Sequence, residues 1–237
     1  NSPTAVSLPA SFFEFFSSPD DYYQRWALGT ALRLLRFLAL LIAITFTAFY
    51  VSVTTYHYEM IPESLLQTLV ESRNRVPFPP VYEALLMETM IELLREAGAR
   101  LPSKIAQTIG IVGGIVIGQA AVQAGLTSNV LIIAVASSAI ASFVIPSYIM
   151  SASLRLMRFG LIIMAGIWGN LGLIMGVALI IIHISGVTSL GAPYMIPVAP
   201  MKGAAWKDVF IRVPFALLKS RPPQTKSPNQ ARQKIRK

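Results

Sequence analysis

The sequence predicts an all-α polytopic membrane protein, with about four transmembrane helices and a further helical hairpin that is interfacial or re-entrant. Three observations support this fold class. The chain is 54% hydrophobic, only 13% of its residues are charged, and its mean hydropathy is +0.59. No charged residue occurs from Ile105 to Leu154 or from Phe159 to Met201. About twenty uncharged, mostly apolar residues are enough to cross a bilayer as a helix, so both stretches can hold spans.

The charge distribution divides the chain into a lead-in, a transmembrane domain and a tail. Residues 1–26 are interpreted as the lead-in from a cytosolic N-terminal region that is missing from this sequence. Residues 27–201 form the predicted transmembrane domain, and residues 202–237 form a basic cytoplasmic tail. Residues 1–199 hold ten Lys or Arg and ten Asp or Glu, so the net charge of +9 lies in the tail. A basic tail after a membrane helix is typical of the positive-inside rule and of attraction to anionic membrane lipid. The alternative, a nucleic-acid-binding arm, is less favoured, and no nucleic-acid partner is expected.

The first predicted span runs from Phe37 to Tyr56, a stretch without a charge. Arg33 and Arg36 stand at its entry, where long cationic side chains can reach the membrane interface. Together with Arg25 they place this end of the span on the cytoplasmic side.

A charged and proline-rich segment separates the first span from the others. Glu63 to Arg73 and Val81 to Gly98 are expected to form two helices around a PFPP turn. The second helix spaces its acids four apart, which places them on one stripe. This stripe is interpreted either as a solvated face, with two arginines as partners, or as a vestibule ring that concentrates cations. The hairpin residues selected on this basis are Pro77, Pro79, Glu83, Glu88, Glu92, Arg95, Glu96 and Arg100.

The second half of the chain is expected to contain the other three spans. They run from Ile105 to Ala124, from Val130 to Ile149 with a kink at an internal proline, and from Phe159 to His183. Ser151 to Arg158 is interpreted as a short basic connection. Ser185 to Pro200, with three prolines, is expected to leave the membrane in an extended conformation.

Glycines and polar residues inside these spans have two interpretations. Glycines spaced four apart line one helix face and let another helix backbone approach, so Gly110, Gly114, Gly118, Gly172 and Gly176 are predicted to pack helices. Polar groups within lipid must face protein or water, so they serve either as interhelical hydrogen-bonding contacts or as the lining of an ion path. The candidate conduit-lining residues are Gln107, Gln119, Gln123, Ser137, Ser138 and Ser142.

The sequence contains no pattern that indicates an enzyme. It has no cysteine, and its two histidines, His57 and His183, each lie at the end of a predicted span. No GxSxG motif is present, and no Gly-Lys-Ser/Thr follows the glycine cluster as a phosphate-binding loop would require. No catalytic residue, metal site or cofactor is therefore expected.

Several blocks of the sequence resemble one family over roughly residues 17–215. The blocks are DDYYQRW, TTYHYEMIP, SRNRVPFPPVYEALLMETMIELLREAGARLP, IAQTIGIVGGIVIGQAAVQAGL, IASFVIP and SLGAPYMIPVAP. In order and spacing they resemble the membrane portion of the A subunit of bacterial spore-germination receptors, the GerA family. One difference is Thr47, where the family more often has a proline, so no kink is expected there.

The resemblance implies a membrane subunit of a nutrient germinant receptor in the inner spore membrane. Such a subunit would oligomerise with its own copies to form a nutrient-gated cation conduit. Its partners would be a transporter-like B subunit, which binds the nutrient, and a lipoprotein C subunit. The positions that match the family's motifs are Pro77, Phe78, Pro79, Glu83, Glu88, Glu92, Arg95, Arg100, Gly110, Gly113, Gly114, Gly118, Gln119 and Ala120.

Two alternatives to a conduit remain. A non-conducting membrane scaffold for a sensing partner would use the same glycines and polar residues for packing. A self-sufficient secondary transporter is less favoured, because such transporters are commonly built from internal repeats and none is visible here.

Overall fold

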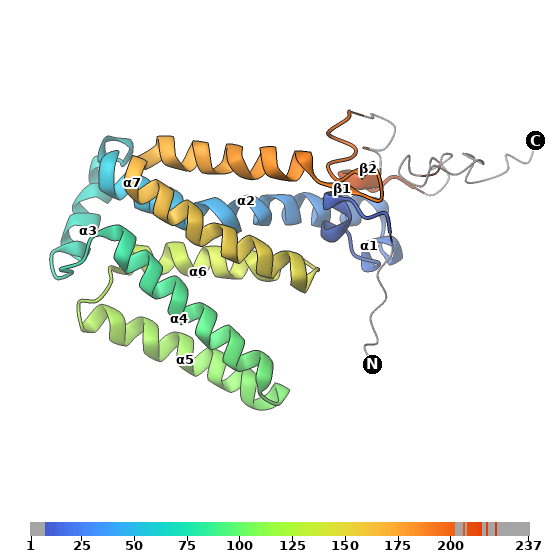
Figure 1. Cartoon of the computed structure of the whole chain (residues 1–237). Coiled ribbons are helices and arrows are strands. Elements are labelled where there is room, and N and C mark those ends of the chain that lie inside the picture. Colours follow the sequence, from blue (N-terminus) through green and yellow to red (C-terminus); the bar gives the residue numbers. More distant parts are fainter. Residues whose placement is uncertain (1–7, 202–205, 207, 215–216, 218–220, 222–237) are drawn as a thin grey trace, which may run out of the picture. The chain divides into compact units, whose positions relative to one another are not determined.

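The computed structural model of the chain is mostly helical (Figure 1). It describes residues 8–201, 206, 208–214, 217 and 221, and within the fifth α-helix the side chains of residues 103–109, 111 and 112 are not described. Apart from two short 3₁₀ helices, η1 and η2, and a two-stranded antiparallel hairpin of β1 and β2, the elements are α-helices. In chain order they are η1 (Phe12–Phe16), α1 (Asp20–Tyr23), α2 (Trp26–Tyr56), η2 (Tyr58–Met60), α3 (Glu63–Arg73), α4 (Pro80–Arg100), α5 (Ser103–Gln123), α6 (Asn129–Phe143), α7 (Tyr148–Gly186), β1 (Thr188–Ser189) and β2 (Ala192–Pro193).

The chain divides into two compact units. The first unit combines the chain up to Ala39 with Val144–Met150 and with the chain from Ala178 onward. Its core is aromatic: the rings of Phe13 and Phe37 both pack against Phe210, with centroids 5.3 and 4.9 Å away. The first unit therefore joins segments from both ends of the sequence.

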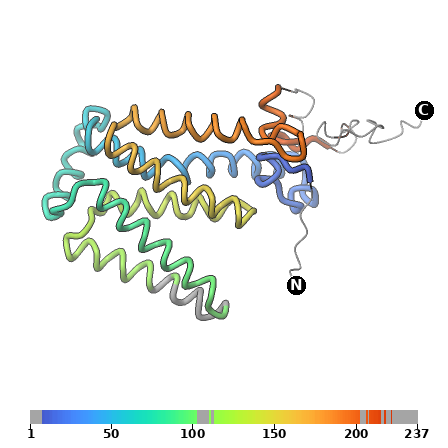
Figure 2. Tube along the Cα trace, viewed as in Figure 1, coloured from blue at the N-terminus to red at the C-terminus, as the bar shows by residue number. Residues whose placement is uncertain are grey.

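The second unit comprises Leu40–Phe143 and Ser151–Val177. Within it α4 packs along α5 and also contacts α6; in Figure 2, α4 and the second half of α5 are drawn in shades of green. The loop after α5 turns at Gly125, whose φ of 68° falls in the left-handed region that favours glycine. A Cβ at Gly125 would lie 2.6 Å from the carbonyl oxygen of Arg75, so no side chain fits between these two loops.

Helix α7 is a helical hairpin rather than one straight helix. Gly169 has φ 61° and ψ −141°, a conformation that is essentially restricted to glycine, and it separates residues 148–168 from residues 170–186. A Cβ at Gly176 would lie 2.4 Å from Leu161, although fifteen residues of straight helix would separate them by about 22 Å. The two legs thus fold back on each other (Figure 1). The prediction of one uninterrupted span from Phe159 to His183 was wrong, because the chain reverses near its middle.

Other predicted elements agree with the structure to different degrees. Helices α3 and α4 confirm the two helices expected around the PFPP turn. Helix α6 ends at Phe143, before Pro146, so the third predicted span is shorter than expected and has no proline kink. Residues 151–158 are helical within the first leg of α7, so the interpretation of this stretch as a connection was also wrong.

Two helices are long and apolar enough to cross a membrane among the residues that the structure describes: Trp26–Tyr56 and Tyr148–Gly186. The apolar helix Asn129–Phe143 is shorter. The predicted count of four spans is therefore not established. The basic tail predicted for residues 202–237 lies mostly outside the described residues.

Candidate functional site

A group of charged side chains lies inside the second unit, and we call it the internal charge network. It consists of Thr47, Glu88, Glu92, Arg95, Ser138, Ser151, Arg155 and Arg158. At its centre Arg158 Nη2 forms an ion pair with Glu88 Oε2 at 2.9 Å, and both side chains are at most 1% exposed. Removing two charges from water is costly unless hydrogen bonds satisfy their remaining atoms.

Two hydroxyl groups also bond to this ion pair. Thr47 Oγ1 donates a hydrogen bond to Glu88 Oε1 at 2.8 Å, and Arg158 Nη1 donates to Ser138 Oγ at 2.7 Å. The Thr47 and Ser138 hydroxyls lie 2.9 Å apart. Helices α2, α4, α6 and α7 each contribute one of these four side chains, so the centre of the network fixes the positions of four helices in the second unit.

A second carboxylate lies one helical turn further along α4. Arg155 Nε contacts Glu92 Oε1 at 3.0 Å, and Arg155 Nη1 donates to Ser151 Oγ at 2.9 Å. The Ser151 hydroxyl in turn donates to the carbonyl of Ser142 at 2.8 Å. This branch therefore connects α4, the start of α7 and the end of α6.

Arg95 is the third arginine of the network and differs from the other two. Its Nη1 is 3.7 Å from Glu92 Oε2, and its Cζ lies 4.4 Å from the centre of the Phe143 ring. All three guanidinium nitrogens are buried, and none forms a hydrogen bond within the part of the chain that the structure describes. The network thus contains a buried cation for which the described residues supply no hydrogen-bond acceptor.

Helical spacing explains how the sequence brings these residues together. Glu88, Glu92 and Arg95 are four and three residues apart on α4, so they share one face, and Arg155 and Arg158 share a face of α7 in the same way. Helices α4 and α7 also approach each other closely at Gly166, where an added Cβ would lie 2.2 Å from the side chain of Val81.

The start of α4 is held by a separate buried carboxylate. Glu83 is 1% exposed, lies 3.2 Å from Arg73 Nη2 and accepts a hydrogen bond from the backbone nitrogen of Ser128 at 3.2 Å. The Ser128 hydroxyl accepts from the nitrogen of Leu131 at 3.2 Å and so satisfies the first turn of α6. Because Glu83 and Glu88 are buried, the interpretation of the whole acidic stripe as a solvated face was wrong. Only Glu96 of the stripe matches that interpretation fully, because it forms an exposed ion pair with Arg100 at 2.7 Å.

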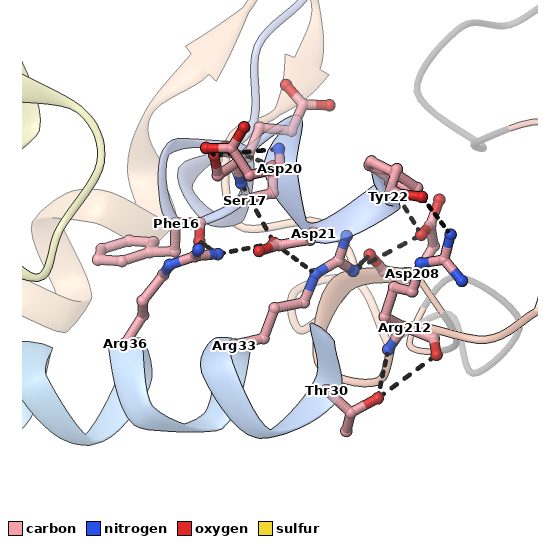
Figure 3. A network of polar contacts seen from close by, with 12 residues as sticks. Phe16, Ser17, Asp20, Asp21, Tyr22, Thr30, Arg33, Arg36, Asp208 and Arg212 are labelled. Atoms are coloured by element: carbon pink, nitrogen blue, oxygen red, sulfur yellow. Dashed lines mark hydrogen bonds and ion pairs between the residues drawn. The ribbon is translucent and has the colours of Figure 1, made fainter. Parts of the chain in front are cut away.

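The first unit contains its own charged group, the Asp21 cluster, which consists of Asp21, Tyr22, Thr30, Arg33, Arg36, Asp208 and Arg212 (Figure 3). Asp21 is fully buried and accepts hydrogen bonds from Arg33 Nε at 3.2 Å and from Arg36 Nη1 at 2.6 Å. Arg36 also donates to the carbonyl of Phe16, and Arg33 to the carbonyl of Asp208. The Asp21 cluster therefore ties segments from both ends of the chain to the start of α2.

Close packing and charge both act on Asp21. A Cβ at Gly29 would lie 2.9 Å from the Asp21 carbonyl oxygen, so the backbone approaches α2 at a residue without a side chain. Burial on its own would raise the pKa of Asp21, but hydrogen bonds from Arg36, Ser18 and Arg33 outweigh it and hold the pKa below its usual range. Asp21 is therefore charged at neutral pH.

The predicted conduit residues do not come together in one place. Gln119 and Gln123 on α5 are exposed, and Ser137 is half-buried and donates to the carbonyl of Ile133. Ser138 and Ser142 are buried within the second unit, and their hydroxyls donate to carbonyls of α6. The side chain of Gln107 lies outside the described residues. The conduit role of these six residues stays a prediction, and the bonds of Ser138 are those expected of a packing contact.

The predicted packing glycines fall into two groups. On α5, no described atom lies within 4 Å of the position that a Cβ would take at Gly110, Gly114 or Gly118. On α7, a Cβ would meet Met164 at Gly172 and Leu161 at Gly176, so these two glycines lie where the legs of the hairpin touch. At the PFPP turn, Pro79 is the cap residue before α4, and Pro77 precedes it.

Sequence reasoning missed half of the internal charge network. Thr47 was noted only as a difference from the family pattern, and Arg155 and Arg158 only as a basic connection. The available signal was that two arginines three apart directly precede a long uncharged stretch. Arginines beside apolar helices are commonly paired with acids inside the protein.

The comparisons with known proteins agree on one family. A sequence profile described as Bacillus/Clostridium GerA spore germination protein matches residues 1–224. The spore germination protein GerQA of Bacillus cereus is 49% identical over 221 residues, which is 93% of this chain and 44% of that protein. The spore germination protein KA of Bacillus subtilis (strain 168) is 45% identical over 98% of this chain and 42% of its own length.

The uncharacterized membrane protein YfkQ of Bacillus subtilis (strain 168) is 39% identical over 94% of this chain and 43% of its own length. The chain thus spans less than half the length of these three curated relatives. No solved structure matches it.

Proposed function

We propose a role in spore germination for this chain, because it belongs to the Bacillus/Clostridium GerA family of spore germination proteins. The chain would act as the membrane portion of a multi-pass receptor subunit in the inner spore membrane. Copies of the subunit would assemble into a nutrient-gated cation conduit, together with a transporter-like B subunit and a lipoprotein C subunit.

The surface of α5 is the single observation that carries the conduit part of this proposal. Gln119 and Gln123 are exposed in the otherwise apolar stretch of α5 from Gly110 to Gln123, and Gly114 and Gly118 have open space where a side chain would stand. In a membrane, exposed amides require water or another protein chain, and exposed glycines permit close approach of a helix. Repeated around an axis, α5 would supply both an interface and a weakly polar lining.

The experiment that tests conduction measures potassium release from spores that carry single substitutions. Gln119→Leu and Gln123→Leu would slow the release or change its ion selectivity, while receptor abundance on immunoblots stays constant. Ser138→Ala is the matched comparator, because Ser138 is buried in the internal charge network and would act through abundance or stability instead. Normal release from spores carrying either glutamine variant at normal abundance would contradict the conduit.

The alternative function is a scaffold that positions a sensing partner and conducts nothing. The internal charge network supports this alternative, because it fixes four helices to one another within the chain. If germination fails only in those variants that lower receptor abundance, the scaffold is the better description.

A further inference from the structure

The internal charge network carries an uncompensated positive charge. Its guanidinium groups are those of Arg95, Arg155 and Arg158, and its carboxylates are those of Glu88 and Glu92. Glu88 faces Arg158 at 2.9 Å and Glu92 faces Arg155 at 3.0 Å, whereas Arg95 reaches Glu92 only at 3.7 Å. The surplus charge therefore lies on Arg95.

No described backbone carbonyl accepts a hydrogen bond from Arg95. Arg95 lies within α4, and the ring beside it belongs to the last residue of α6. Carbonyls inside α4 already accept bonds from nitrogens four residues further on, and none of the carbonyls at the end of α6 forms a hydrogen bond with the Arg95 guanidinium. Leaving a buried charged donor without an acceptor is costly, which favours an acceptor from outside this part of the chain.

The Phe143 ring that lies over the Arg95 guanidinium can change its rotamer. The Phe143 ring lies 4.4 Å from Arg95 Cζ, yet 69% of the Phe143 side chain is exposed. Exposed side chains change rotamer within nanoseconds, so the ring can turn away without any change in the packing of the helices. A ligand approaching from the surface at Phe143 would reach the guanidinium directly.

We propose that Arg95, covered by Phe143, is a binding site for a phosphate oxyanion. Guanidinium presents several N–H donors in a plane, which matches the oxygens of a phosphate group. In a membrane protein such a group comes either from the headgroup of an anionic phospholipid or from a soluble phosphate. Glu92 Oε2 is the weak resident counterion, and the incoming phosphate displaces it while Glu92 Oε1 stays with Arg155. The site concerns binding alone and holds whether or not the chain conducts ions.

The two sources of phosphate are distinguished by two measurements on the intact protein in detergent. In the first, native mass spectrometry counts the phospholipids that remain bound after detergent washing. In the second, delipidated protein is titrated with inorganic phosphate. Retention of a phospholipid indicates a headgroup site, and saturable binding of inorganic phosphate without retained lipid indicates a soluble ligand. Either result supports the proposal if it depends on Arg95.

Two substitutions are expected to change phosphate affinity in opposite directions, and a folding defect could not strengthen binding. Arg95→Gln should weaken phosphate binding by about tenfold or more, because the charged donors are lost. Glu92→Gln should strengthen binding by several fold, because the competing carboxylate loses its charge. Arg100→Gln is the matched control on the same helix, because Arg100 is exposed and paired with Glu96, and it should leave the affinity within about twofold.

Three results would overturn the proposal. One is that the unmodified protein binds neither phospholipid nor inorganic phosphate. Another is that Arg95→Gln and Arg100→Gln weaken binding equally, which would reduce the effect to general surface charge. The third is that Arg95→Gln leaves phosphate binding unchanged and weakens self-association instead, which would identify the acceptor as a carboxylate of another protein chain.

Discussion

The Asp21 cluster and the internal charge network each set three arginines against two carboxylates. In the Asp21 cluster these are Arg33, Arg36 and Arg212 with Asp21 and Asp208. Each arginine of that cluster also donates to a backbone carbonyl: Arg36 to Phe16, Arg33 to Asp208 and Arg212 to Tyr22. In the internal charge network no described carbonyl accepts from Arg95.

The difference follows from the backbone around each group. The Asp21 cluster is built where chain segments turn and short helices end, so carbonyls with free lone pairs point toward it (Figure 3). The internal charge network lies between long helices, most of whose carbonyls bond to their own helix, although the Ser142 carbonyl at the end of α6 accepts from Ser151. With equal charge composition, every arginine of the Asp21 cluster therefore has a carbonyl acceptor, whereas Arg95 has no acceptor among the described residues.

The largest effect is expected from removing Arg158. Arg158→Leu leaves the carboxylate of Glu88 buried without its cation, and breaking a buried pair in this way costs about 3–5 kcal/mol of unfolding free energy. The measurement is unfolding by a denaturing detergent, followed by the loss of helical circular dichroism. The double variant Arg158→Leu, Glu88→Leu should recover part of the loss. A single variant as stable as the unmodified protein would show that the pair is not buried as described.

A somewhat smaller and pH-dependent effect is expected in the Asp21 cluster. Because the pKa of Asp21 is lowered on folding, its charged form contributes stability that is fully present above the usual value of 3.8. That stability is lost as the pH falls through the lower folded pKa. Asp21→Asn should therefore lower the free energy of unfolding at pH 6. The difference in this free energy between the variant and the unmodified protein should become smaller below about pH 3.8. Unfolding curves at several pH values test this, and a difference that does not vary with pH would contradict it.

Local features of this chain could be predicted from its sequence, and partners distant in the chain could not. The PFPP turn within the 57–104 segment and the spacing of its acids predicted α3 and α4, whose bounds differ from the predicted ones by at most two residues. The burial of Glu88 depends on Thr47, 41 residues away, and on Arg158. Nothing in the local pattern distinguishes Glu88 from Glu96 on the same stripe.

The turn in α7 shows a second limit of sequence reasoning. Glycines occur at positions 166, 169, 172 and 176, and all of them suit close helix packing. Only Gly169 adopts a positive φ, and the position of that break is set by contacts of the folded chain. Its Cβ position would lie 3.0 Å from His57 Nε2 and 3.1 Å from Tyr56 Cδ2. Composition alone favoured one span where the structure has a hairpin.

A moderate effect is expected from the hydroxyl of Thr47. Thr47→Val keeps the shape of the side chain but removes the donor to Glu88 Oε1, which should cost about 1–3 kcal/mol. Thr45→Val is the matched control two residues earlier, because the Thr45 hydroxyl is exposed and donates to the carbonyl of Leu41 in its own helix. The free energy of unfolding of both variants gives the comparison. Equal losses would mean that the hydroxyl matters through helix α2 and not through the internal charge network.

The smallest effect is expected at the other end of the acidic stripe, where Glu96 pairs with Arg100 in water. Glu96→Gln should lower the free energy of unfolding by at most about 0.5 kcal/mol, because exposed pairs four residues apart on a helix contribute little. Glu88→Gln makes the same chemical change two turns earlier on α4, but there it removes the charge that faces Arg158, so its loss should be several times larger. Both variants make the same chemical change on the same helix. The ratio of their losses in free energy of unfolding, measured in one assay, therefore reports the difference in burial. A ratio near one would show that α4 presents its whole stripe to solvent, and the internal charge network would then not exist in the folded protein.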